Sequence, residues 1–290
     1  DLGYVVLDEC HYMGDEGRGT VWEEIVVNAP KDVALVALSA TVANIAEIAD
    51  WISLVHRPIV PITHPDRPVP LQYLVADLSG ELHDLEAARQ GKVKLLADER
   101  AIRQTGRGAA GKAGWAAHRG RGHSQRVADP KAMIEELEGK GWLPALYFIF
   151  SRAGCERALE EYLAEGKPLL TRPQQREVDQ AIREATQESP AIAESPLNQT
   201  IFQALGMGIG LHHAGILPSV KRLVELLFER GLCRVVFATE TMSLGIHMPA
   251  KSVVLQGLTK RTDRGFRGLT HNELTQMAGR AGRRGIDLEG

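Results

Sequence analysis

The 290-residue sequence is poor in cysteine, in aromatic side chains and in long apolar runs. Its three cysteines, Cys10, Cys155 and Cys233, are far apart and form no CxxC pair, which argues against a disulfide framework or a zinc site. No apolar run approaches the roughly 20 residues that a membrane-spanning helix needs. These absences predict a protein without a membrane partner that works in a reducing compartment, the cytoplasm.

A complete phosphate-binding loop of the form G-x-x-x-x-G-K-[ST], the Walker A loop, is also missing from the sequence. Residues 106–113 come nearest, but Ala113 stands where such a loop needs a hydroxyl for Mg²⁺, and no strand precedes the glycines. The other Gly-Lys pairs lack the serine or threonine that should follow. We therefore interpret residues 106–113 as a chance match.

Basic residues are concentrated in one stretch of a chain whose net charge is −3. Between Arg89 and Lys131 there are eleven lysines and arginines but three acidic residues, so the remainder of the chain is acidic. The Arg-Gly pairs within 107–122 resemble segments that bind RNA, although a solvated linker explains them equally well. We expect residues 79–130 to be a flexible basic linker or insertion.

Outside that stretch, short apolar runs alternate with amphipathic segments. The strands and helices expected in the first part are 4–7, 18–27, 33–38 and 45–54. Those expected in the second part are 143–150, 152–164, 174–187, 197–205, 208–211, 218–230, 233–238 and 252–255. This alternation predicts an α/β fold with two parallel-sheet domains, residues 1–78 and residues 131–290.

Polar residues follow the first two expected strands, at the edge where α/β proteins commonly bind ligands. Asp8, Glu9 and His11 follow the first strand, and Ser39 and Thr41 follow the second. In an adjacent Asp-Glu pair, one carboxylate can hold Mg²⁺ through water while the other accepts a proton from an attacking water. Taken alone, however, an acidic turn and two turn or cap hydroxyls explain these residues at least as well.

Residues 276–285 combine a glutamine, three arginines and three glycines. The pair Thr270 and Glu273 has the spacing of a capping box, which predicts that a helix starts there, and Gly282 and Gly285 are expected to end it. The helix would place three polar side chains on one face: Gln276, Arg280 and Arg283. Arginines on such a glycine-rich platform suit a phosphate, although a solvated charged face is the alternative.

The adjacent histidines His212 and His213 invite a metal interpretation, since histidine is a common metal ligand. Neighbouring residues on a strand point to opposite faces, so the two imidazoles are not expected to share one ion.

The order of these motifs resembles the superfamily-two helicases of the DExH type, specifically the superkiller and exosome-cofactor RNA helicases. The segments that carry the resemblance are Asp8-Glu9-Cys10-His11, Ser39-Ala40-Thr41, the Arg57-Pro58 and Arg67–Leu71 turns, His212–Gly215, Phe237–Gly245 and Gln276–Gly285. The likeness covers most of the chain outside about 79–140 and 165–197.

That resemblance implies two RecA-like domains that bind ATP and Mg²⁺ between them, the first incomplete at its N-terminus. It implies that Asp8 holds the metal, that Glu9 activates the hydrolytic water, and that His11 and Gly245 lie near the nucleotide. Three residues would act on the γ-phosphate, the arginines as fingers: Gln276, Arg280 and Arg283. Ser39 and Thr41 would couple hydrolysis to domain movement.

The resemblance also implies a nucleic-acid surface on the second domain that binds the backbone without selecting a sequence. Its expected residues are Ser151, Arg152, His213, Gly215, Thr239 and Thr241. The 256–269 loop lies where relatives carry a hairpin near the duplex junction, so Phe266 is a candidate wedge.

The expected function is ATP-dependent unwinding of nucleic acid, with RNA favoured as substrate and RNA-decay proteins as partners. A DNA helicase, or a nucleic-acid-binding module without turnover, remains the alternative. Two departures from the group stand out. His247 replaces a customary asparagine, and the chain begins at the acidic motif, so we expect this chain by itself to hydrolyse ATP poorly or not at all.

Overall fold

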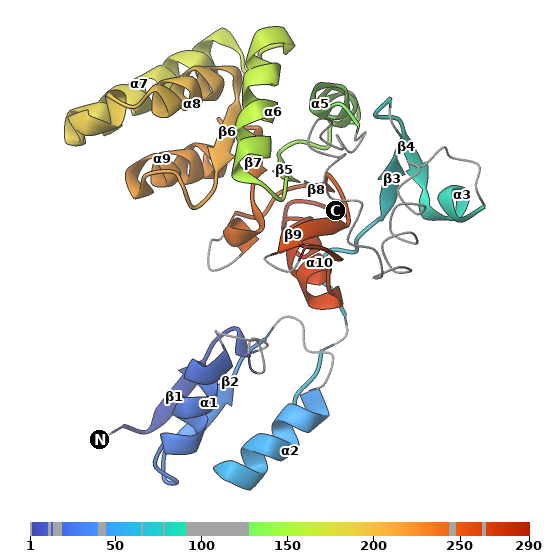
Figure 1. The fold of residues 1–290 in the computed structure, drawn as a ribbon, viewed down its shortest axis with the longest axis vertical. Coiled ribbons are helices and arrows are strands. Elements are labelled where there is room, and N and C mark those ends of the chain that lie inside the picture. The colour runs from blue at the N-terminus through green and yellow to red at the C-terminus, as the bar shows by residue number, and fades with distance from the viewer. Residues whose placement is uncertain are drawn as a thin grey trace, which may run out of the picture. The chain divides into compact units, whose positions relative to one another are not determined.

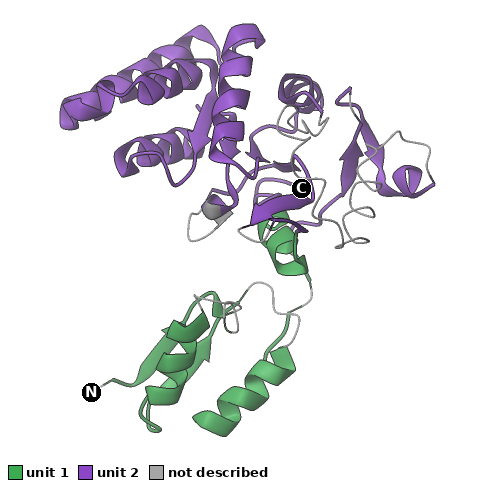
Figure 2. Cartoon of the chain, viewed as in Figure 1, with its two compact units in different colours: residues 1–68, 269–279 green, residues 69–268, 280–290 purple. Residues whose placement is uncertain are grey.

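The fold is known from a computed structural model of the chain (Figure 1). The structure describes residues 2–10, 13, 19–39, 45–64, 66–77, 79–90, 128–243, 248–262 and 265–290. Within it the chain divides into two compact units, coloured separately in Figure 2. Unit 1 contains residues 1–68 and 269–279, and unit 2 contains residues 69–268 and 280–290.

Unit 1 is built on a pair of parallel strands, β1 (Tyr4–Leu7) and β2 (Ala34–Ala37). The helices α1 (Gly19–Asn28) and α2 (Ile45–Val55) follow the two strands, as the sequence pattern predicts. Four buried side chains form the core between these elements: Leu7, Cys10, Val26 and Ile52.

Unit 2 contains a four-stranded parallel sheet in the order β6-β7-β5-β8. Its strands are β5 (Ala145–Phe148), β6 (Ile209–His212), β7 (Val235–Ala238) and β8 (Ser252–Leu255). Every residue of β5, β6 and β7 is buried, which explains why these strands are continuous apolar runs rather than alternating ones. Tyr147 and Phe237, paired across β5 and β7, also contact edge to face with ring centroids 5.4 Å apart.

The helices of unit 2 are α5 (Pro130–Gly139), α6 (Arg152–Glu165), α7 (Arg172–Glu188), α8 (Pro196–Met207) and α9 (Pro218–Glu229). Two short 3₁₀ turns are η2 (Pro190–Ala193) and η3 (Glu240–Ser243). α6 packs over β6 and β7, α9 packs on β6, and α7 lies against α8 and α9 (Figure 1). The approach of α9 requires Gly210, because a Cβ there would lie 2.8 Å from a methyl of Val224.

Two antiparallel hairpins complete unit 2. One joins β3 (Leu74–Ala76) to β4 (Leu82–Asp84) and leads into α3 (Leu85–Arg89). The other joins β9 (Thr259–Thr262) to β10 (Gly265–Gly268), within the 256–269 segment where a loop or hairpin was expected. Residues 79–90, expected to belong to a flexible segment, thus carry a strand and a helix, while residues 91–127 lie outside the described part of the chain.

The helix near the C-terminus begins where the sequence predicts but is shorter. α10 (His271–Ala278) has the expected capping box, with Thr270 N–H 2.8 Å from the Glu273 carboxylate and Glu273 N–H 3.2 Å from the Thr270 hydroxyl. Its C-cap is Gly279, not Gly282 or Gly285. The prediction that Gln276, Arg280 and Arg283 share one helical face is therefore wrong, because both arginines follow the end of the helix.

The physical reason is competition from a neighbouring segment. Arg280 C=O accepts from Ala250 N–H at 2.9 Å, and Gly282 N–H donates to Ala250 C=O at 2.9 Å, so the chain leaves the helix to run beside residue 250. Glycine at 279 adds little helix propensity to oppose this change.

The predicted α/β class with parallel sheets is confirmed, and the architecture is consistent with RecA-like helicase domains. Among the described helices, none combines the length and the apolar character that crossing a bilayer demands.

Candidate nucleotide and nucleic-acid sites

In unit 1, the acidic motif and the second polar motif lie at the same edge of the sheet. Leu38 N–H donates to Leu7 C=O at 2.8 Å, and Leu38 C=O accepts from Cys10 N–H at 2.9 Å. The parallel pairing thus brings Asp8 and Glu9, which follow β1, beside Ser39, which follows β2. The structure places these three residues together as the sequence predicts, while His11 and Thr41 lie outside the described residues.

The turn that carries Asp8 and Glu9 has an unusual backbone. Glu9 has φ of 53°, in the left-handed region that non-glycine residues seldom adopt. Trp22 Nε1 donates to Asp8 C=O at 2.9 Å, and Glu9 N–H donates to Asp8 Oδ1 at 2.9 Å, so α1 and the acidic pair itself hold the turn. Strained backbone of this kind is concentrated at functional sites, which favours a functional explanation over a plain acidic turn.

The Asp8 side chain fits a hard divalent cation. It is exposed at the strand end, and its Oδ1 is the oxygen that accepts the Glu9 N–H. The second oxygen of Asp8 remains for a metal-bound water, as far as the described residues show. Burial raises the pKa of the adjacent Cys10 thiol, so this thiol is not suited to act as a thiolate ligand.

In unit 2, a cavity of about 180 Å³ opens at the carboxyl ends of three parallel strands. The residues that line it are Phe150, Ser151 and Arg152 after β5, Ala214 after β6, Thr239 and Glu240 after β7, and Lys260 and Arg261 of β9. Segments far apart in the sequence meet here because the parallel strands end at one edge. The predicted nucleic-acid residues Ser151, Arg152 and Thr239 are thereby brought together.

The start of α6 faces this cavity with donor groups and a positive charge. Ser151 is the N-cap of α6, and its hydroxyl accepts from Gly154 N–H at 3.0 Å. Arg152 is the first helical residue and is exposed. A helix N-terminus carries unpaired N–H groups and a partial positive charge, so this corner of the cavity is suited to an anion.

His213 is a buried side chain that stabilises the turn formed by residues 213–215. Its side chain is 1% exposed, its Nδ1 accepts from Gly215 N–H at 3.1 Å, and its Nε2 lies 3.2 Å from the Glu156 carboxylate of α6. A side chain this buried is not itself placed to touch a ligand. The exposed groups of the turn are Ala214 and Gly215.

The two histidines do face opposite sides of the sheet, as predicted. His212 Nε2 lies 2.9 Å from the Glu225 carboxylate of α9, whereas His213 turns to Glu156 of α6. Burial lowers the pKa of both imidazoles, although the carboxylates oppose that shift. Their separate partners explain the pair without a metal ion.

Sequence reasoning missed Lys260, Arg261 and Glu240 as lining residues of the cavity. Lys260 Nζ lies 2.5 Å from Glu240 Oε2, which links the β9–β10 hairpin to η3. Arg261 is exposed and pairs across the hairpin with Phe266, which is 77% exposed. The sequence signal for these residues is the basic pair Lys260-Arg261 after β8. The sequence alone does not show that β9 lies at the ends of β5 and β7.

The glutamine and the two arginines assigned to the last motif belong to different units of the structure. Gln276 lies in α10 in unit 1, whereas Arg280 and Arg283 belong to unit 2. Arg283 forms a two-pronged ion pair with Asp287, a residue that sequence reasoning did not single out. Thr241 lies in η3, but the structure does not describe its side chain. Gly245 lies outside the described residues.

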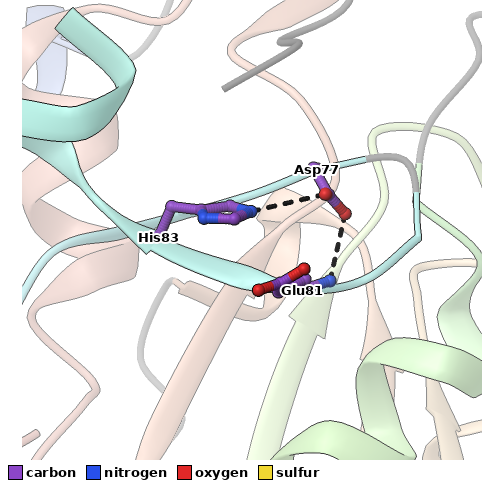
Figure 3. A group of neighbouring side chains, drawn as sticks. All are labelled: Asp77, Glu81 and His83. Carbon is purple, nitrogen blue, oxygen red and sulfur yellow. Dashed lines mark hydrogen bonds and ion pairs between the residues drawn. The ribbon is translucent and has the colours of Figure 1, made fainter. Parts of the chain in front are cut away.

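A group of potential metal ligands lies on the β3–β4 hairpin, formed by Asp77, Glu81 and His83 (Figure 3). Asp77 Oδ1 accepts from Ser79 N–H at 2.8 Å, the Ser79 hydroxyl at 2.6 Å and Glu81 N–H at 3.1 Å, and Oδ2 lies 3.3 Å from His83 Nε2. These bonds lower the pKa of Asp77 to about 2. These hydrogen bonds explain the Asp77 carboxylate as a group that stabilises the hairpin turn.

Two family matches define the class of protein. Residues 1–48 match the DEAD/DEAH box helicase family, and residues 169–285 match the helicase conserved C-terminal domain. The chain therefore carries segments of both helicase domains, which confirms the helicase resemblance of its motifs.

Curated relatives narrow this class to helicases of the superkiller type. The probable helicase HelY of Mycobacterium tuberculosis is 39% identical over 303 residues, which cover 100% of this chain and 33% of HelY. The chloroplastic DExH-box ATP-dependent RNA helicase DExH15 of Arabidopsis thaliana is 37% identical, with 99% of this chain and 26% of the relative covered. Human superkiller complex protein 2 is 37% identical, with 100% and 24% covered. The chain thus spans about a quarter to a third of these relatives.

Proposed function

We propose that the chain is the motor core of an ATP-dependent helicase that unwinds RNA. The observation that carries this proposal is the cation-lined cavity at the carboxyl ends of β5, β6 and β7, in a chain with helicase family matches at both ends. The similarity to DExH15, an ATP-dependent RNA helicase by name, favours ATP as cofactor and RNA as substrate.

In this proposal, nucleotide hydrolysis depends on the acidic motif that contains Asp8 and Glu9 and on the motif at residues 276–285. Asp8 binds Mg²⁺ through water, and Glu9 accepts the proton of the attacking water. Bound Mg²⁺ would neutralise charge on the phosphates. Gln276, Arg280 and Arg283 bind the γ-phosphate, and the two arginines stabilise the negative charge that develops on it. His11 and Gly245 are proposed to contact the nucleotide.

The coupling of hydrolysis to movement is assigned to Ser39 and Thr41. Ser39 directly follows Leu38, whose carbonyl accepts the Cys10 N–H at 2.9 Å. A shift of the acidic turn therefore acts on the backbone next to Ser39. This short connection favours a coupling role for Ser39 over a role as a simple cap hydroxyl.

The nucleic-acid site is proposed at the cavity of unit 2. Arg152, Arg261 and the N-terminus of α6 bind phosphates, Thr239 and Thr241 supply hydroxyl or backbone contacts, and the 213–215 turn offers its backbone. None of these groups selects a base, so binding follows the backbone of a strand. The exposed Phe266 beside Arg261 is suited to stack against a base and so to act as a wedge.

Hydrolysis is tested in the full-length protein with Glu9→Gln and Arg283→Ala. Each change should abolish the nucleic-acid-stimulated ATPase rate, because it removes the general base or the positive charge. Matched controls are Glu24→Gln on the exposed face of α1 and Arg284→Ala, an exposed neighbour of Arg283. Normal turnover in Glu9→Gln or Arg283→Ala would overturn the assignment.

The substrate is tested with paired RNA and DNA duplexes that have the same sequence and the same single-stranded overhang. Unwinding of the RNA duplex at the higher rate is expected. If DNA alone is unwound, the RNA proposal is wrong and the DNA-helicase alternative holds. If ATP is not hydrolysed although the full-length protein binds both strands, the protein is a binding module.

The basic segment and the cellular setting belong to the same proposal. Deleting residues 89–131 should weaken nucleic-acid binding if that segment contributes charge, and an unchanged affinity would make it a linker. We further propose a cytoplasmic location and RNA-decay partners. The three cysteines Cys10, Cys155 and Cys233 are free and buried, which is compatible with a reducing compartment.

A further inference from the structure

The Asp287 carboxylate engages Arg283 with both of its oxygens. Arg283 N–H and Nε–H donate to Asp287 Oδ2 at 2.9 and 2.8 Å, and Arg283 Nη2 donates to Oδ1 at 2.8 Å. Two parallel N–H···O bonds between a guanidinium and a carboxylate are the strongest and most directional form of this ion pair. The third bond fixes the carboxylate to the backbone of the same residue.

The surroundings prevent the Asp287 carboxylate from turning away. Its side chain is 5% exposed, against 25% for Arg283. The backbone between the two residues is a closed turn, in which Ile286 N–H and Asp287 N–H donate to Arg283 C=O at 3.1 and 2.9 Å. A buried acid held in a hydrogen-bonded turn does not exchange its partner as a surface ion pair does.

The turn is itself anchored to the segment that precedes β3. Gly290 N–H donates to Pro70 C=O at 2.9 Å, and Gly290 C=O accepts from Gln72 N–H at 2.9 Å. The chain from Arg283 to Gly290 is therefore fixed at both ends. The position of the Arg283 guanidinium is set by this frame rather than by the flexible side chain alone.

The ion pair leaves part of the guanidinium for a ligand. Arginine has five side-chain N–H donors, of which the Nε proton and one Nη2 proton bind Asp287. The Nη1 protons and the second Nη2 proton lie on the other edge of the planar group. That edge is the fork that binds two oxygens of a phosphate. Consistent with a tight pair, Asp287 raises the pKa of Arg283, and Arg283 lowers the pKa of Asp287.

We propose that Asp287 is the positioning residue for Arg283, holding its guanidinium with the Nη1–Nη2 edge turned to the phosphate that Arg283 binds. This inference rests on the proposed function, in which Arg283 acts on the γ-phosphate. A side chain that is oriented in advance does not have to be ordered during the reaction, and misplacement by about 1 Å can cost about 100-fold in rate. The Asp287 carboxylate also offsets part of the positive charge of Arg283. Asp287 therefore favours the reaction by orienting the guanidinium and not by strengthening the electric field at the phosphate.

The experiment compares Asp287→Asn with wild type in the full-length protein, with Asp179→Asn, an exposed change on α7, as the matched control. Asparagine keeps the size of the side chain but loses one acceptor oxygen and the charge. We expect kcat for stimulated ATP hydrolysis to fall about 10- to 100-fold, with KM for ATP and affinity for single-stranded RNA within about twofold. Asp287→Glu should recover part of the rate.

A double variant shows whether Asp287 acts through Arg283. Because the two changes remove the same interaction, the residual ATPase rate without nucleic acid should be no lower in Arg283→Ala with Asp287→Asn than in Arg283→Ala alone. A further loss in the double variant would overturn the inference. So would wild-type kcat or a raised kcat in Asp287→Asn, or a rate loss accompanied by loss of RNA binding and a lowered Tm. If Arg283→Ala itself hydrolyses ATP normally, the proposed function fails and the positioning role falls with it; if Arg283→Ala is inactive while Asp287→Asn is normal, the positioning role alone fails.

Discussion

Lys260 and Glu240 form an ion pair at 2.5 Å that joins the β9–β10 hairpin to the turn that follows β7. The lysine side chain is 12% exposed and the glutamate side chain 40% exposed, so the pair lies at the rim of the cavity rather than in bulk solvent. At the phosphate-binding surface proposed above, this carboxylate would oppose the charge of the ligand. We therefore expect Glu240 to hold the hairpin in place and to balance the charge of Lys260.

Glu240→Gln should strengthen binding of single-stranded RNA, because it removes a negative charge from the proposed phosphate site. We expect Kd to fall about fivefold at low salt, the size of a Coulomb contribution of about 1 kcal/mol at the surface. The measurement is fluorescence anisotropy over a range of salt concentrations. Glu229→Gln, exposed in the last turn of α9, is the control for the same change in net charge. Weaker binding by Glu240→Gln would show that the position of the hairpin matters more than charge.

Arg152→Ala should weaken RNA binding about tenfold at physiological salt and reduce the slope of log K against log salt by about one, since one phosphate contact is lost. Arg176→Ala, an exposed arginine on α7, removes the same charge away from the cavity. Affinity measured for oligonucleotides of different sequence should fall uniformly, because a phosphate contact carries no sequence information. An equal loss in both variants would indicate a general charge effect and contradict the assigned site.

Gly282→Ala should destabilise the chain by about 1–3 kcal/mol, because it combines an unfavourable backbone with a clash. Gly282 has φ of 80°, and a Cβ there would lie 2.6 Å from a methyl of the buried Val69. Gly285 has φ of 77° but no atom within 4 Å of such a Cβ, so Gly285→Ala isolates the backbone term. Chemical denaturation of both variants measures the difference. Equal losses would mean that Val69 moves aside without cost.

The stability of the chain should fall as pH decreases below about 6.5, the ordinary pKa of histidine in an unfolded chain. Burial depresses the pKa of His212 and His213 in the folded state, so below that pH the unfolded state binds protons that the folded state does not. The loss stops once the pH is below the folded-state pKa values. Glu225 and Glu156 oppose the depression, whereas Lys221 and Arg152 add to it.

His212→Gln tests this dependence, since glutamine keeps an N–H donor for Glu225 but does not titrate. The curve of Tm against pH should be flatter for this variant than for wild type between pH 7.5 and 5.5, values chosen to bracket about 6.5. His64→Gln, at an exposed position, is the control for a His-to-Gln change away from the buried pair. A curve as steep in His212→Gln as in wild type would assign the pH dependence to other groups.

The helicase class and the α/β fold were predictable from the sequence, because both depend on local chemistry. Apolar runs such as 233–238 are typical of buried parallel strands, and the spacing of Thr270 and Glu273 predicts a helix start from their own hydrogen bonds. The motif order from Asp8 to Gly285 indicated the helicase family, and the family matches confirm it. The individual roles of the site residues stay predictions.

Tertiary structure alone decided where that last motif stops being a helix. The sequence pattern favoured one helical face for Gln276, Arg280 and Arg283, since local spacing carries no information about Ala250, which draws the chain away after Ala278. The meeting of Arg152 with Lys260 likewise depends on how distant backbone segments pair, whereas the Arg283–Asp287 pair forms within a local turn. Sequence determined which groups the protein has, and long-range backbone hydrogen bonds decided which of them meet.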